Sequence, residues 1–181
     1  DMVFGYNFPK LNKIKSSNIV ITDSVFSNIT EKLLKFSNFE KNFIFCPLIK
    51  EPEVIYNRNK FRFLRYQYSK LKFNIYLFLF NKEINLTKYY LNNKILFLKK
   101  LNNSSLNICG RFHGLVISII LKTPFLVINS NTHKSKGLLK DLKMNNKLIT
   151  IKDLKYNTLF KNKNFTRSQS KKIDQYKVNA K

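Results

Sequence analysis

The sequence predicts an α/β fold in which a mostly parallel sheet is flanked by helices. Short apolar runs of strand length alternate with segments of helical periodicity through most of the chain. The runs favour β-branched and aromatic residues, and Pro, Gly, Asn or Asp residues bound them. A hydrophobic fraction of 44% in 181 residues is enough to form a buried core. Strands that alternate with helices in this way are typical of βαβ units.

The predicted strands are short and almost entirely apolar. The first has the sequence Asn-Ile-Val-Ile-Thr, with turn-forming residues directly after it, and Pro47 stops the second. Such runs are typical of parallel strands that are covered on both faces. In chain order, the predicted strands cover residues 18–22, 43–48, 73–80, 106–109, 124–129 and 147–151.

The predicted helices follow from apolar spacing. Residues 29–36 have a helical period, and Asn28 with Glu31 resembles a capping box. Further helices are predicted at 57–72, 112–121 and 133–142. Between them, 86–91 is a helix candidate, whereas 95–101 fits a helix or a strand. From Lys161 onward the chain is polar and basic, and we expect a flexible extension or a poorly packed end.

The formal net charge is +24, from 34 basic and 10 acidic residues. The chain is crowded with Lys, Asn, Ile, Phe and Tyr and has one Ala, a bias typical of an A+T-rich gene. Compositional drift and selection for an anionic partner both remain open. In either case the surface should attract polyanions at low salt. The basic and aromatic segment 57–72 could bind nucleic acid, but we favour an amphipathic helix with a solvated basic face.

The cysteines and the apolar runs exclude several classes of protein. Cys46 and Cys109 lie in apolar strand-like runs, so we expect buried free thiols. The two His and two Cys residues show no metal-ligand spacing. No signal peptide is recognised, and the longest purely apolar run near residue 76, 76–80, is too short to span a bilayer.

Polar residues follow three predicted strands, at 22–24, 110–114 and 130–134. Ligands of open α/β sheets bind beyond the carboxyl ends of the strands. At the second position, Arg111 offers a planar fork of donors, and His113 carries or releases a proton near neutral pH. If the strands are parallel neighbours, Arg111, His113, Lys134 and His133 converge on one pocket. For His133 and Lys136 we favour ordinary solvated side chains.

Residues 107–142 resemble the polysaccharide pyruvyl transferase family. The matching sequence is Cys-Gly-Arg-Phe-His-Gly, then an apolar helix and a Thr-Pro strand, then Asn-Ser-Asn-Thr-His-Lys before Gly-Leu-Leu-Lys-Asp-Leu. Segments 20–24 and 45–48 are compatible with earlier parts of the family. The resemblance implies two Rossmann-like domains that face a cleft, as in the GT-B architecture.

The resemblance also implies a reaction and a set of site residues. A pyruvyl group passes from phosphoenolpyruvate to sugar hydroxyls of a cell-surface polysaccharide and forms a ketal. Arg111 and Lys134 would hold the carboxylate and phosphate of the donor, and His113 would be the general acid or base. Further candidates at the same turns are Gly110, Asn131 and His133.

The implied partners are phosphoenolpyruvate as donor substrate, without any cofactor, and a saccharide acceptor, free or lipid-linked. We expect a cytoplasmic protein, with peripheral contact to an anionic membrane left open, and no nucleic-acid partner. The alternatives are a GT-B glycosyltransferase that uses a nucleotide sugar, a basic module that binds RNA or an anionic surface, and a family member that has lost its activity.

The resemblance divides the chain into three parts. Residues 1–56 would end a first Rossmann-like domain or connect to it, 57–160 would form a C-terminal Rossmann-like domain with the Arg-x-His motif, and 161–181 would be a basic polar tail. The chain begins at Asp1, and most of the family's amino-terminal domain has no counterpart in it. We therefore expect a piece of a longer protein, which alone could lack activity.

Overall fold

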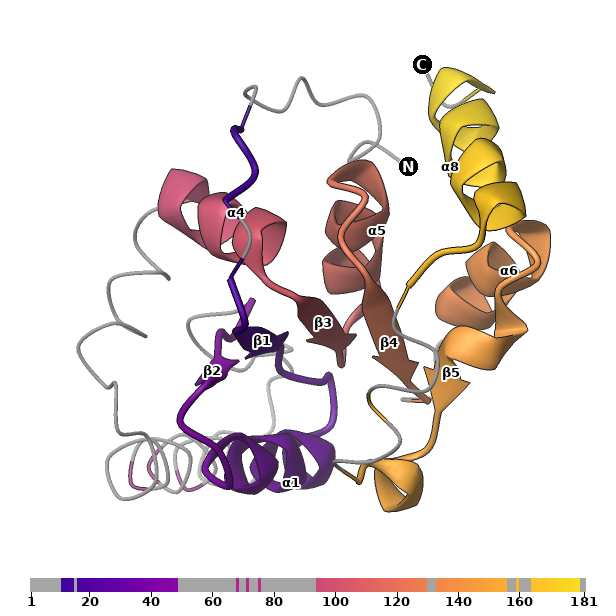
Figure 1. Ribbon diagram of the computed structural model, residues 1–181. Coiled ribbons are helices and arrows are strands. Elements are labelled where there is room, and N and C mark those ends of the chain that lie inside the picture. Colours follow the sequence, from indigo (N-terminus) through magenta and orange to yellow (C-terminus); the bar gives the residue numbers. More distant parts are fainter. Residues whose placement is uncertain are drawn as a thin grey trace, which may run out of the picture.

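The described residues of the computed structural model form a five-stranded sheet, parallel throughout, at its centre (Figure 1). The structure describes residues 11–14, 16–48, 68, 71, 75, 94–129, 133–155, 159 and 164–179. The strand order is β2-β1-β3-β4-β5. The strands are β1 (Ile19–Ile21), β2 (Phe43–Phe45), β3 (Leu106–Cys109), β4 (Phe125–Ile128) and β5 (Leu148–Ile149).

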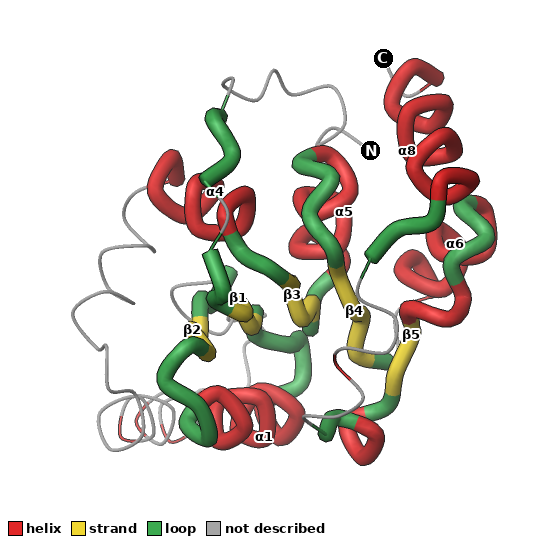
Figure 2. The backbone as a smooth tube through the Cα atoms, in the orientation of Figure 1, coloured by secondary structure: helices red, strands yellow, loops and turns green. Residues whose placement is uncertain are grey.

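Helices cover both faces of the sheet (Figure 2). Helix α1 (Ser27–Ser37) lies on one face and follows β1 in the chain. Helices on the opposite face are α4 (Lys94–Asn103), α5 (Phe112–Ile120), α6 (His133–Asp141) and α8 (Arg167–Asn179). The short 3-10 turns η1 (Asn145–Lys147) and η2 (Ile151–Asp153) flank β5. The fold is therefore a three-layer α/β arrangement of the Rossmann-like type.

Alternation along β3 shows how side chains of one strand pack on both faces of the sheet. Leu106 and Ile108 belong to the cluster under α1, whereas Cys109 belongs to the cluster under α5 and α6. Successive side chains of a strand point to opposite faces, so a run that is apolar throughout is stable only when both faces are covered. All four residues of β3 are buried. The apolar composition of the strands is explained by this double burial.

The strand order places a topological switch between β1 and β3. From β1 the chain passes through α1 to β2 on one side, and from β3 it passes through α5 to β4 on the other side. The two connections lie on opposite faces of the sheet (Figure 1). In open parallel sheets, the crevice for ligands opens at the carboxyl ends of the strands at such a switch. The loops after β1 and β3 are therefore the first place to look for a site.

The structure confirms most of the predicted elements. Strands are found within 18–22, 43–48, 106–109, 124–129 and 147–151, and helices within or around 29–36, 112–121 and 133–142. The ambiguous segment 95–101 lies in helix α4, where Leu98 and Leu101 are buried.

Two local predictions are wrong. The end of the chain is not a loose extension among the described residues: α8 packs on α5, and Ile173 is fully buried there. Phe165 and Tyr176 pack beside Ile173. A hydrogen bond from Lys177 to the carbonyl of Ile120 and an ion pair between Asp174 and Lys122 also hold this otherwise polar helix. The capping box is also absent, because the N-cap of α1 is Phe26 and no side chain caps it.

Several predictions fall wholly or partly outside the described residues. The segment 86–91 lies outside them. Of the predicted helix 57–72, the structure describes Tyr68 and Leu71, which are both helical. Ile75 is helical too, so the prediction of a strand at 73–80 is wrong at that position.

The predicted division of the chain near residue 56 would separate strands that the structure pairs. β1 and β2 precede it and β3 follows it, yet β1 hydrogen-bonds to both β2 and β3. The described residues form this one sheet. They therefore do not test the two-domain GT-B arrangement.

Candidate active site

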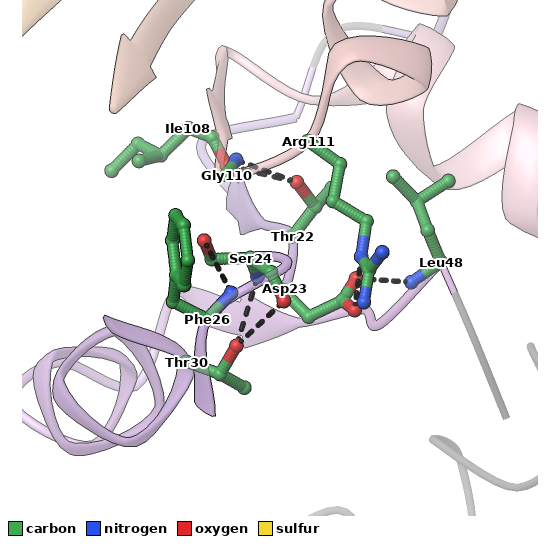
Figure 3. Close-up of polar contacts among 9 residues, drawn as sticks. All are labelled: Thr22, Asp23, Ser24, Phe26, Thr30, Leu48, Ile108, Gly110 and Arg111. Atoms are coloured by element: carbon green, nitrogen blue, oxygen red, sulfur yellow. Dashed lines mark hydrogen bonds and ion pairs between the residues drawn. The ribbon is translucent and has the colours of Figure 1, made fainter. Parts of the chain in front are cut away.

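An ion pair joins the loop after β1 to the loop after β3 (Figure 3). Nε of Arg111 donates a hydrogen bond to Oδ2 of Asp23 at 2.6 Å. The other carboxylate oxygen, Oδ1, accepts a hydrogen bond from the backbone N–H of Leu48 at 2.6 Å. One aspartate thus connects the loops that follow three neighbouring strands, β1, β2 and β3. This contact lies at the topological switch of the sheet.

The Asp23–Arg111 pair is nearly closed to water. The side chain of Asp23 is 6% exposed and that of Arg111 is 15% exposed. Burial raises the pKa of Asp23 above its ordinary value, and the positive charge of Arg111 and the N–H of Leu48 oppose this rise. A charged hydrogen bond in such surroundings is stronger than one on the surface, and removal of either partner leaves a costly buried charge.

Gly110 allows the two loops to approach each other. Its backbone N–H donates to Oγ1 of Thr22 at 3.0 Å. A Cβ atom at this position would lie 2.4 Å from the carbonyl oxygen of Asp23, which is too close for any side chain. Gly114 is also confined, because a Cβ there would lie 3.2 Å from both Oγ1 of Thr22 and Cδ1 of Leu48. The glycines of the motif therefore serve close packing at the sheet edge.

A buried polar network holds the first turn of α5 against β3. Nδ2 of Asn107 donates to Oγ of Ser118 at 3.0 Å, and Ser118 donates to the carbonyl of Gly114 at 2.8 Å. Oγ of Ser104 donates to Oδ1 of Asn107 at 2.6 Å. Networks in which buried groups are paired with one another make an arrangement rigid. The start of α5 is thus fixed by side chains inside the protein.

Side-chain hydrogen bonds also fix the loop after β1. The hydroxyl of Thr30 accepts from the N–H of Ser24 at 2.9 Å and donates to the carbonyl of Ser24 at 3.0 Å. Oγ of Ser24 accepts from the N–H of Phe26 at 3.3 Å. These bonds pair backbone N–H and C=O groups where the chain leaves the sheet and enters α1. The loop that carries Asp23 therefore has a defined shape.

His113 lies in the first turn of α5 with an exposed side chain. Arg111 is the N-cap residue with extended backbone angles, and its side chain makes no cap hydrogen bond. The first backbone N–H groups of a helix lack intrahelical partners and carry partial positive charge. His113 is therefore a solvent-accessible imidazole beside a helix start that suits an anion.

The basic residues considered after β4 lie at the start of α6. His133, Lys134 and Lys136 are all exposed. Because β3 and β4 are parallel neighbours, the starts of α5 and α6 lie at the same edge of the sheet. In the described part of the chain, no hydrogen bond or ion pair joins Lys134 to Arg111 or His113. Asn131 lies outside the described residues.

Sequence reasoning singled out the segment 22–24 as a strand end but did not place Asp23 in the site. It also missed the N–H of Leu48. The signal for Asp23 was present, since a carboxylate directly after a buried strand lies at the end of the sheet where ligands of open α/β folds bind. Its pairing with Arg111 depends on β1 lying next to β3, and that adjacency is a property of the sheet order.

Other site types find no support in the part of the chain that the structure describes. No group of three or more His, Cys, Asp or Glu residues there could hold a metal ion. Both cysteines are free and buried, as predicted, and burial raises the pKa of Cys109 to about 12. None of the described helices combines the length and the apolar character that crossing a bilayer requires.

Comparison with known proteins gave one match. The family model described as polysaccharide pyruvyl transferase matches residues 1–132. This range includes β1 to β4, Asp23, and the turn from Gly110 to Gly114, and it ends just before His133. A search of curated proteins and a search of solved structures each gave no match.

Proposed function

Because the chain belongs to the polysaccharide pyruvyl transferase family, we propose that it transfers a pyruvyl group from phosphoenolpyruvate to sugar hydroxyls, with a ketal as product. The observation that carries the proposal is the position of the Arg111–His113 turn. The turn lies inside the range that the family model matches, and it lies at the switch of the sheet, where ligands of this fold bind.

The donor is a small molecule with a carboxylate and a phosphate, so its site needs several donors and positive charges. Arg111 supplies a guanidinium at the start of α5, and the start of the helix itself adds N–H groups. Lys134 supplies an ammonium group at the start of α6 on the same edge. We assign the carboxylate and phosphate to Arg111 and Lys134 together, which positions the donor and stabilises charge as phosphate leaves.

We assign proton transfer to His113. Ketal formation needs a proton on the methylene carbon of the donor and removal of protons from the sugar hydroxyls that attack the neighbouring carbon. The first hydroxyl adds to that carbon as the methylene carbon is protonated. The carbon–oxygen bond to phosphate then breaks and releases inorganic phosphate, and the second hydroxyl adds to the same carbon. The exposed imidazole of His113, two residues after Arg111 in the chain, is suited to either proton transfer.

Binding of the donor is tested first with the full 181-residue chain. Phosphoenolpyruvate should raise the melting temperature, and a concentration of a hundred times Kd should add about 2.7 kcal/mol to the free energy of unfolding. Lys134→Ala should reduce this stabilisation, and Lys140→Ala, which removes an exposed lysine in the last turn of the same helix, should not. Stabilisation by nucleoside diphosphates without any by phosphoenolpyruvate would instead favour a nucleotide-sugar glycosyltransferase.

Turnover is tested with phosphoenolpyruvate and a hexose-containing acceptor, and the measurement is release of inorganic phosphate. His113→Ala should abolish release and retain the stabilisation by phosphoenolpyruvate. Undiminished release in that variant would remove His113 from its role. Tight RNA binding that persists at physiological salt would instead favour the basic-module alternative.

A further inference from the structure

We propose that Asp23 is a positioning residue, whose buried carboxylate fixes the Arg111 guanidinium so that its terminal nitrogens form the anion-binding group of the site. The inference rests on the proposed function for the identity of the anion, phosphoenolpyruvate. The contact between Asp23 and Arg111 is independent of that identity.

The carboxylate of Asp23 has both oxygens engaged. Oδ2 accepts from Nε of Arg111, and Oδ1 accepts from the backbone N–H of Leu48, each at 2.6 Å. A backbone donor cannot swing away as a side chain can, so the N–H of Leu48 fixes the plane of the carboxylate. The loop around Asp23 is itself held by the reciprocal bonds between Ser24 and Thr30. The direction in which Asp23 points is therefore set by the backbone.

Arg111 uses only one of its three guanidinium nitrogens in this contact. Nε is bound to Asp23, and the two terminal nitrogens donate no hydrogen bond to a described residue. The terminal edge of a guanidinium is a planar fork that matches a carboxylate or a phosphate with two parallel hydrogen bonds. Because Nε is held by Asp23, the two terminal nitrogens point in one fixed direction. An anion can then bind them without any loss of side-chain freedom on binding.

The charges explain why a site for an anion contains a carboxylate. A guanidinium that is 15% exposed would be costly without a counter-charge whenever the donor is absent. Asp23 supplies that counter-charge from the protein side and leaves the opposite edge of the guanidinium free of it. The incoming anion then meets donors that are already oriented, which is how preorganised electrostatic sites work.

A purely structural role is the competing explanation, since Asp23 also joins three loops. The two roles differ in what they predict for variants. If Asp23 acts through Arg111, Asp23→Asn weakens anion binding only while Arg111 is present. If Asp23 is merely a link between loops, the loss of affinity is the same with and without Arg111.

The first measurement is the NMR signal of the Arg111 Nε–H. In the unchanged chain, without ligand, the hydrogen bond to buried Asp23 should make this proton exchange slowly with water. Asp23→Asn keeps the size of the side chain and an oxygen for the N–H of Leu48, but it removes the charge, and exchange should become fast. Asp174→Asn is the matched control, because it breaks the exposed ion pair with Lys122 far from this turn. A slowly exchanging Arg111 Nε–H in Asp23→Asn would overturn the inference.

The second measurement is the affinity for phosphoenolpyruvate by calorimetry. Asp23→Asn should weaken binding about ten- to a hundredfold, the loss expected when a charge-assisted hydrogen bond to the anion is no longer formed well. In the Arg111→Ala background, the same change should not weaken binding further. An unchanged affinity in Asp23→Asn, or equal losses in both backgrounds, overturns the inference. Absence of phosphoenolpyruvate binding by the unchanged chain overturns the proposed function, while the exchange rate still decides whether Asp23 fixes Arg111.

Discussion

Two parts of the same sheet edge carry the predicted site residues, and they are built differently. At the ends of β1 and β3, Asp23, Gly110 and Arg111 lie in close contact and almost out of reach of water. At the start of α6, His133 and Lys134 are exposed side chains. The first part is formed before any ligand arrives, and the second is free to adjust. The proposed donor site would thus combine a rigid guanidinium, Arg111, with a solvated ammonium group, Lys134.

The largest contrast between the two parts should appear when their cations are removed. Arg111→Ala leaves the buried carboxylate of Asp23 without a counter-charge, and we expect the free energy of unfolding to fall by about 3 kcal/mol. Lys134→Ala removes an exposed charge and should change it by less than about 0.5 kcal/mol. Urea denaturation of both variants measures the two values. Equal effects would show that the described burial of the Asp23–Arg111 pair has no energetic consequence.

The close approach of the loops after β1 and β3 can be broken at Gly110. Gly110→Ala would place a Cβ atom 2.4 Å from the carbonyl oxygen of Asp23, so one of the two loops must move. We expect a loss of about 2 kcal/mol in the free energy of unfolding, as for other overpacked sites, and weaker binding of phosphoenolpyruvate. Urea denaturation and calorimetry on the same sample check both. Unchanged stability and affinity would mean that neither the fold nor the binding of phosphoenolpyruvate needs the close approach of the two loops.

The pH dependence of stability distinguishes two aspartates in different surroundings. Burial raises the pKa of Asp23, so the folded state holds this proton more tightly than the unfolded chain. Its contribution to stability therefore falls as the pH rises above about 4 through the raised pKa. Hydrogen bonds from the side chain and backbone of Thr150 lower the pKa of exposed Asp153, whose contribution is lost as the pH falls.

Denaturant unfolding from about pH 3 to about pH 7 tests these opposite signs. Asp23→Asn should lack the decline in stability on going to higher pH, and Asp153→Asn should lack part of the loss at acid pH. The slopes are compared and not the absolute stabilities, since Asp23→Asn also disturbs Arg111. The same slope in Asp23→Asn as in the unchanged chain would contradict the raised pKa.

The smallest expected change in the free energy of unfolding is an increase, and it concerns α6, in the second part of the sheet edge. Gly137 lies within α6, and a Cβ atom there would meet nothing within 4 Å. Gly137→Ala should therefore stabilise the protein by up to about 1 kcal/mol, because Ala favours a helix more than Gly does. Thermal unfolding of Gly137→Ala and Gly110→Ala measures the two effects, and the two variants are a matched pair because each makes the same change from Gly to Ala. A destabilised Gly137→Ala would indicate that α6 packs more closely than described.

Local patterns in the sequence were sufficient where one segment decides its own structure. The apolar runs that became β1, β3 and β4 predicted strands, because each is short, apolar and bounded by turn residues. The mostly apolar helix α5 followed from its length and from the turn before it. The end of the chain was mispredicted, because the burial of Ile173 against α5 depends on a partner more than fifty residues away.

The sequence by itself determined the alternation of strands and helices, the buried thiols, and the turn that carries Arg111 and His113, since periodicity and turn chemistry act over a few residues. Only the tertiary structure decided that Arg111 meets Asp23 and the N–H of Leu48, although 88 residues separate Asp23 from Arg111. The physical reason is the order of the strands. Placing β1 between β2 and β3 brings three distant loops to one edge, and no local preference of the chain encodes that order.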